Sequence, residues 1–239
     1  LDLYAINGRP SSDTSNADYV NRISFGAGLS VSKDFIGHSR KSSFLIKPKI
    51  QYSTFFSTDT KDDVPNRDSA DYRLDDSNLF FVNQYQGRDN LQNNQRVNFG
   101  LDNYLTSDLF GDLDFFIGQS YRVGGDEDNT LIKNPNRQSD IINNLNWQIN
   151  NNTNINWKYL IDNDTLEENY SNLSLMTKVL DLKITSSHSS INNNFTDGNQ
   201  DREEFNFKVD KKFGNNWKLG YSSTYDMSNN DTEKIKEKI

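Results

Sequence analysis

The residue types that most often carry out catalysis are sparse in this chain of 239 residues. It has no cysteine, so neither a disulfide nor a thiolate metal site lies within it. The two histidines, His38 in an expected turn and His188 near the end of an expected strand, are far apart in the sequence. No carboxylate stands in a pattern that would orient either imidazole. The sequence therefore predicts no catalytic residues, no enzyme activity and no cofactor.

Two acidic stretches, residues 124–129 and 197–201, have the oxygen-rich side chains that bind divalent cations. In the second, oxygen ligands alternate as they do in calcium loops, and Glu203 follows closely. The downstream spacing to a bidentate glutamate that completes such a loop is missing. Solvated external loops explain both stretches, and the sequence predicts no metal site.

The elements that would position any site are short segments in which apolar and polar residues alternate. Successive side chains of a strand point to opposite faces, so each segment has an apolar face and a polar face. In 94–106, Val97 and Phe99 lie on one face, whereas Arg96 and Asn98 lie on the other. We expect eleven strands and a twelfth that starts near residue 232. Their ranges are 1–6, 20–33, 42–56, 94–106, 112–122, 138–149, 153–162, 167–177, 180–190, 201–212 and 217–227.

Charges on the apolar faces occur only near strand ends, whereas the polar faces carry charge in mid-strand. A Lys or Arg that faces lipid at the bilayer midplane costs roughly 2–4 kcal/mol, so the apolar faces suit lipid and the polar faces suit a lumen. Only 33% of the residues are apolar, too few for a large conventional core. Pro48 interrupts one strand, where we expect a bulge or a local loss of pairing. The charges that we expect to face the lumen are Arg96, Arg122, Lys158, Lys183, Lys208 and Lys218.

Tight turns alternate with long polar connections along the chain. Residues 57–93 and 123–137 are long, whereas 107–111 and 150–152 are short. Outer-membrane barrels have short periplasmic turns and longer external loops. The sequence therefore predicts an all-β fold, an antiparallel up-and-down outer-membrane β-barrel. We expect residues 1–239 to form a single partial barrel domain, an open or curled sheet of about 11–12 strands, with a long external loop at 57–93.

Charge and hydropathy exclude two other classes. The formal net charge of −8 argues against a nucleic-acid partner. No run approaches the ~18 consecutive apolar residues of a transmembrane helix.

The most distinctive sequence motifs lie in the longest connection and in the strand after it. They comprise Leu74, Asp75, Asp76, Asn78, Leu79 and Phe80, then Gly87 and Asp89, then Arg96, Asn98 and Gly100. This stretch resembles the LptD family of lipopolysaccharide-assembly outer-membrane proteins. That family has an acidic pair before Asn-Leu-Phe, a Gly-x-Asp, and a strand reading Arg-Val-Asn-Tyr-Gly-Leu. Residues 44–51 and 118–122 are similar to adjacent strands of the family, so the resemblance spans roughly 42–122. Asn90 stands where the family often has Arg, and the family's cysteines and periplasmic domain are absent here.

The resemblance implies a non-catalytic task, the insertion of lipopolysaccharide into the outer leaflet of the cell outer membrane. It also implies three kinds of partner besides lipopolysaccharide: an outer-membrane lipoprotein plug (LptE-like), periplasmic bridge proteins and membrane lipid. The apolar cluster within 74–85 would be costly to leave in water, so we expect the long loop to fold over or into the barrel mouth. A passive porin or receptor-type barrel shares every feature except the text of 74–101, and a soluble β-rich adhesion module is a further alternative.

Overall fold

The computed structural model describes residues 2–7, 21–58, 74–83, 93–125, 137–192, 201–214, 217–228 and 235–238. All regular structure in these ranges is β-strand. The strands are β1 (Asp2–Asn7), β2 (Asn21–Ser32), β3 (Phe35–His38), β4 (Ser42–Ser57), β5 (Asn94–Ser107), β6 (Gly111–Gly125), β7 (Ile141–Asn150), β8 (Thr153–Ile161), β9 (Glu168–Val179), β10 (Leu182–Ile191), β11 (Arg202–Phe213), β12 (Trp217–Asp226) and β13 (Ile235–Lys238). No helix in the described ranges is long and apolar enough to cross a membrane.

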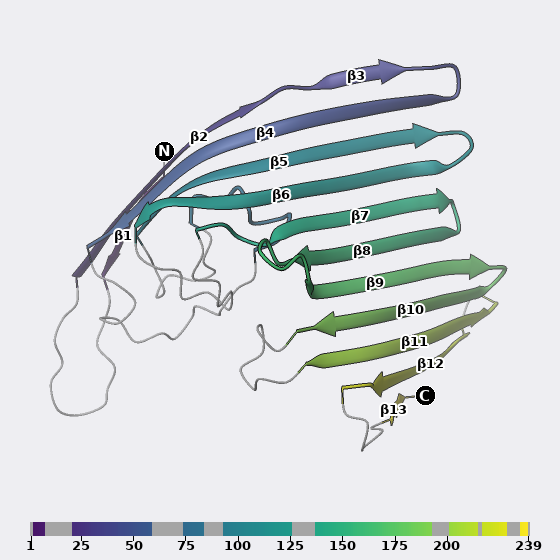
Figure 1. Cartoon of the computed structure of the whole chain (residues 1–239). Coiled ribbons are helices and arrows are strands. Elements are labelled where there is room, and N and C mark those ends of the chain that lie inside the picture. Colours follow the sequence, from purple (N-terminus) through teal and green to yellow (C-terminus); the bar gives the residue numbers. More distant parts are fainter. Residues whose placement is uncertain are drawn as a thin grey trace, which may run out of the picture. The chain divides into compact units, whose positions relative to one another are not determined.

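The strands form one sheet in which each lies beside the next strand of the sequence (Figure 1). β3 is the exception, because it continues the line of β2 along β4. The thirteen strands therefore occupy twelve positions, which confirms the antiparallel up-and-down, all-β fold and the expected number of strands. Among the described strands, β1 pairs only with β2 and β13 only with β12, so the sheet is open.

The break between β2 and β3 lies opposite Pro48. Ser32 pairs with Lys49 and Phe35 pairs with Ile46, in the same register, with no ladder pairs between them. Proline has no N–H to donate, although its carbonyl oxygen still accepts a bond from the Lys33 N–H at 3.2 Å. Pairing is thus lost locally at Pro48 while β4 itself runs through.

Connections of two or three residues alternate with connections of six or more, as expected. In an up-and-down sheet this places the tight turns at one end of the strands and the long connections at the other. Two boundaries differ from expectation. His38 lies in β3, paired with Ser43, and not in a turn. Leu180 lies in the turn between β9 and β10 with a φ of 55°, because Val179 pairs with Leu182 and the chain must reverse between them.

The chain divides into two compact units. The first comprises Leu1–Ser32, Lys49–Gly100 and Gly118–Ser139, and the second comprises Lys33–Pro48, Leu101–Ile117 and Asp140–Ile239.

Burial is inverted relative to a water-soluble sheet. In β4, Ile50 and Tyr52 are each 44% exposed, whereas the alternating Gln51 and Ser53 are 6% and 1% exposed. Fifteen polar side chains are buried in the described residues, against six large apolar ones. In a protein surrounded by water this ratio is the reverse. A bare apolar face of this extent requires an apolar covering medium or partner.

Candidate functional site

Residues 74–83, here called the inner segment, lie between β4 and β5 and contain one helical turn at 75–79. The Asp75 carboxylate accepts hydrogen bonds from the N–H groups of Ser77 (2.8 Å) and Asn78 (3.3 Å). The Asn78 side-chain oxygen accepts one in return from the Asp75 N–H at 2.8 Å. The Leu79 N–H then bonds to the Asp75 carbonyl at 3.1 Å and closes a single helical turn. This reciprocal pattern is that of a capping box, so Asp75 and Asn78 fix the shape of the turn.

Two leucines flank this turn and bury it. Leu74 precedes the capping aspartate and Leu79 lies four positions after it, which are the positions that pack together in a hydrophobic staple. Leu74 is 3% exposed and Leu79 is completely buried. The turn is therefore a small packed unit and not a solvated loop.

The inner segment lies on the polar face of the first unit. Cβ atoms added to Gly26 and Gly28 of β2 would each come within 2.9 Å of a Val82 methyl group. Both glycines alternate with the exposed Leu29, so they belong to the polar face. Phe55 of β4 packs beside Gly26 and is 2% exposed. The absence of side chains at Gly26 and Gly28 makes the space that Val82 occupies.

A chain of hydrogen bonds joins three strands to the inner segment. The Arg96 guanidinium donates to the Ser120 hydroxyl at 3.3 Å, and that hydroxyl donates to the Asn98 side-chain oxygen at 2.7 Å. The Asn98 amide donates to the Gln51 side-chain oxygen at 3.0 Å. The Gln51 amide donates to the Phe80 carbonyl at 2.9 Å. Ser120, Asn98 and Gln51 each both accept and donate along the chain, an arrangement in which neighbouring bonds strengthen one another.

A cation adds a further contact at the same place. The Lys49 ammonium lies 3.9 Å from the centre of the Phe80 ring. Such a contact stabilises by about 0.5–2 kcal/mol, depending on its exposure. The polar face therefore holds the inner segment through apolar burial, hydrogen bonds and a cation–π contact. This arrangement can occlude a polar surface, and it presents no nucleophile and base in contact.

The positions singled out in the sequence separate into groups. Leu74, Asp75, Asn78, Leu79 and Phe80 build the inner segment, Arg96 and Asn98 belong to the hydrogen-bond chain, Gly100 is buried on β5, and Asp76 is half-buried. Gly87, Asp89 and most of the acidic stretches lie outside the described residues. Of the six selected charges, Arg96 is 4% exposed, Arg122 and Lys158 are half-buried, and Lys183, Lys208 and Lys218 are exposed.

Sequence reasoning missed Gln51 and Ser120, and the glycines that make room for the segment. One available signal was the run of small residues at alternate positions of β2, comprising Ser24, Gly26, Gly28 and Ser30. Another was the capping-box spacing of Asp75 and Asn78 between two leucines. It also missed that His188 has a carboxylate partner, since its Nε2 lies 2.8 Å from Glu203 Oε1. Among the described residues no group of three or more metal-ligating side chains is present.

The second unit buries a carboxyl group at the long-connection end. Asp140, just before β7, is 2% exposed, and its Oδ2 accepts a bond from the Asn169 amide at 3.0 Å. Burial, reinforced by the nearby charge of Asp162, raises the pKa of Asp140 to about 6. Asp162 has the opposite shift, because the N–H groups of Thr165 and Asp164 donate to its carboxylate and lower its pKa.

These shifts predict opposite pH dependences. The folded protein holds the Asp140 proton more tightly than the unfolded chain, so stability falls as the pH rises from about 4 to 6. We expect Asp140→Asn to raise the thermal stability of the full-length protein in detergent above pH 6 and to leave it unchanged near pH 4. Asp162→Asn, the matched control, should lower stability at neutral pH and have less effect in acid. Equal melting temperatures for wild type and Asp140→Asn at all pH values would contradict the assignment.

Comparison with protein-family models identifies the family of the chain. Residues 2–217 match the model of LptD, LPS transport system D. The match extends from β1 to the first residue of β12 and includes the inner segment and the whole hydrogen-bond chain. Comparison with curated proteins finds no match.

Proposed function

The chain belongs to the LptD family, the LPS transport system D proteins, and from this premise we propose that it forms part of an outer-membrane β-barrel that inserts lipopolysaccharide into the outer leaflet. The observation that carries this proposal is the family match together with the inverted burial of the sheet. The family is one of transport and assembly proteins of the outer membrane. The residues of this chain bind and guide, and no bond is made or broken by them.

In this proposal the bare apolar faces contact lipid. Ile23, Leu29, Val31, Phe99 and Leu219 are between 48% and 72% exposed and alternate with polar residues on their strands. Transfer of apolar area from water stabilises by roughly 25 cal/mol per Å², so these faces favour a bilayer over water. Residues 1–239 would then form one partial barrel domain.

The polar faces line the lumen in this proposal. Arg96, Arg122, Lys158, Lys183, Lys208 and Lys218 would face the water-filled interior. The long connection at 57–93 would be external, with the inner segment folded back onto the lumen wall. The contacts of the inner segment support this arrangement, because Phe80 and Val82 contact polar-face positions of β4 and β2. A lipoprotein plug and periplasmic bridge proteins would complete the transport path.

Depletion of the full-length protein in living cells tests this function. We expect newly made lipopolysaccharide to disappear from the cell surface, as measured by surface labelling of its sugars, and a plasmid copy to restore it. A passive porin predicts a different result. Unchanged surface lipopolysaccharide with slower uptake of small solutes would contradict the proposal.

A further inference from the structure

Lysines gather on the polar face of β9–β12, at the end that carries the tight turns. They line a hollow of about 490 Å³ together with two leucines and two aspartates. The lining residues are Lys178, Leu180, Asp181, Leu182, Lys183, Asp210, Lys212 and Lys218. Four ammonium groups and two carboxylates give this hollow a net charge of +2, within a chain whose net charge is −8.

The lysines face one another directly across the sheet. Lys178 of β9 is opposite Lys183 of β10, and Lys212 of β11 is opposite Lys218 of β12. Like charges directly opposite on neighbouring strands are destabilising. Two such pairs within four strands are therefore a cost to the fold that an anionic ligand would relieve.

One carboxylate lies between the two pairs. Asp210 is opposite Lys183, and its Oδ1 and Oδ2 lie 3.3 Å and 3.7 Å from the ammonium groups of Lys218 and Lys208. Gly220 leaves room for it, since a Cβ there would come within 2.8 Å of Asp210 Oδ1. Lys178, Lys183 and Lys212 make no ion pair with any described residue. Positive charge thus exceeds what Asp210 neutralises.

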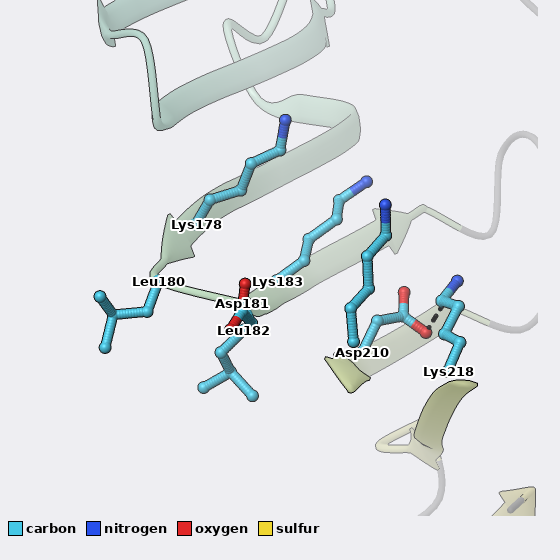
Figure 2. Close-up of a pocket in the computed structure, with 8 residues that line it drawn as sticks. Lys178, Leu180, Asp181, Leu182, Lys183, Asp210 and Lys218 are labelled. Atoms are coloured by element: carbon cyan, nitrogen blue, oxygen red, sulfur yellow. Dashed lines mark ion pairs between the residues drawn. The ribbon is translucent and has the colours of Figure 1, made fainter. Parts of the chain in front are cut away.

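The lysine side chains of the hollow point to one side of the strands. In Figure 2 the ammonium groups of Lys178, Lys183 and Lys218 extend to one side of the sheet, while Leu180 and Leu182 extend to the other. The alternation of the strands explains this, because the lysines occupy polar-face positions and Leu182 an apolar-face position. The polar face of β9–β12 therefore presents ammonium groups, without Leu182, to any ligand that binds there.

We propose that Lys178, Lys183, Lys212 and Lys218 form a binding site for the phosphate groups of a phosphorylated glycolipid on the polar face of β9–β12. This inference rests on the proposed function, which makes that face a lumen through which such a molecule passes. Ammonium groups act as point charges toward phosphate, and several of them converging on one hollow favour a ligand with more than one phosphate.

Binding to the purified full-length protein in detergent tests the site. The variant is Lys183→Gln/Lys212→Gln, which removes one lysine from each facing pair. The control is Lys211→Gln, which removes one lysine charge from the position beside Lys212 on the opposite face of β11, where the lysine lies 4.9 Å from the Phe213 ring centre. The probes are a diacylated glucosamine disaccharide with two phosphates, the same lipid without phosphates, inorganic phosphate and polyglutamate.

We expect the double variant to bind the phosphorylated lipid at least about tenfold more weakly than the wild type, because each charge-assisted contact contributes to the binding free energy. Its melting temperature should equal or exceed that of the wild type, since like-charge repulsion is relieved, whereas a merely structural role would lower it. Lys211→Gln should bind as the wild type does. Binding of inorganic phosphate alone at comparable affinity would assign the site to free phosphate.

Three results would overturn the site. The first is equal binding of the phosphorylated lipid by the wild type and the double variant. The second is equal binding of the lipid with and without its phosphates. The third is tighter binding of polyglutamate, lost in the double variant, which would assign the surface to an acidic protein segment. Failure of the wild-type protein to bind lipopolysaccharide at all would instead contradict the proposed function.

Discussion

Replacement of Leu79 by aspartate releases the inner segment from the polar face and makes cells sensitive to antibiotics that the outer membrane normally excludes. Leu79 is completely buried. Truncation of such a leucine to alanine alone costs about 2–5 kcal/mol. Because an unpaired buried carboxylate costs more, the ratio of docked to undocked segment should fall by about a hundredfold or more. The measurement is the minimal inhibitory concentration of a large glycopeptide antibiotic, supported by the conductance of the purified protein in planar bilayers.

Phe81→Asp is the matched control, because Phe81 belongs to the same segment and is 59% exposed. It adds the same charge without entering a packed site, so antibiotic sensitivity should remain at the wild-type level. Expression and surface lipopolysaccharide are measured in parallel to show that both variants assemble. If Leu79→Asp assembles fully and leaves both conductance and sensitivity unchanged, the inner segment does not occlude the lumen.

Replacement of Asn98 by leucine breaks the hydrogen-bond chain at its centre. Asn98 is completely buried and bonds to both Gln51 and Ser120. The substitution preserves volume but leaves one side-chain oxygen and one hydroxyl without their partner, at about 1–3 kcal/mol each. We expect a lower free energy of unfolding in urea for the full-length protein refolded into lipid. We also expect faster proteolysis near the inner segment. Without the hydrogen bond from Asn98, the Gln51 side chain that bonds to the Phe80 carbonyl is held less firmly.

A double-mutant cycle isolates the coupling. Gln51→Leu/Asn98→Leu removes both partners of one bond and should lose less stability than the two single changes together, with a coupling of about 0.5–3 kcal/mol. Asn103→Leu provides the control on the same strand, because its amide donates to the Phe115 carbonyl at 3.3 Å, away from the inner segment. If the stability losses of Gln51→Leu and Asn98→Leu simply add, the hydrogen bond between Gln51 and Asn98 does not couple the two residues.

The strands could be predicted from the sequence because each has one apolar and one polar face. That alternation of apolar and polar residues predicted eleven strands, each with boundaries within three residues of those observed. The alternation of short and long connections predicted the up-and-down order of the strands. β3 was not predicted, because four residues ending at a histidine give too short a pattern and the break opposite Pro48 hides their continuity with β2. Leu180 was assigned to a strand because apolar character says nothing about a positive φ.

The site was less predictable, because it depends on contacts between residues that lie far apart in the sequence. The text of 74–80 was distinctive, but nothing local shows that Phe80 meets Gln51 or that Val82 fits over Gly28. The pairing of the lysines on neighbouring strands could not be predicted from the sequence either. Lys183 and Lys218 were selected singly as lumen charges, whereas Lys178 and Lys212 became visible only when the register placed them opposite.

An engineered disulfide tests whether the inner segment docks on the polar face. A Cβ on Gly28 would lie 2.9 Å from a Val82 methyl carbon, so the Cβ atoms of Gly28→Cys and Val82→Cys lie at most about 4.4 Å apart, within disulfide range. Oxidation of the full-length double variant in native outer membranes should yield the cross-linked peptide by mass spectrometry. Leu29→Cys/Val82→Cys, with one cysteine on the opposite, 72% exposed position, should yield none. Absence of the Gly28–Val82 link in an assembled protein, or equal linking in the control, would contradict the account.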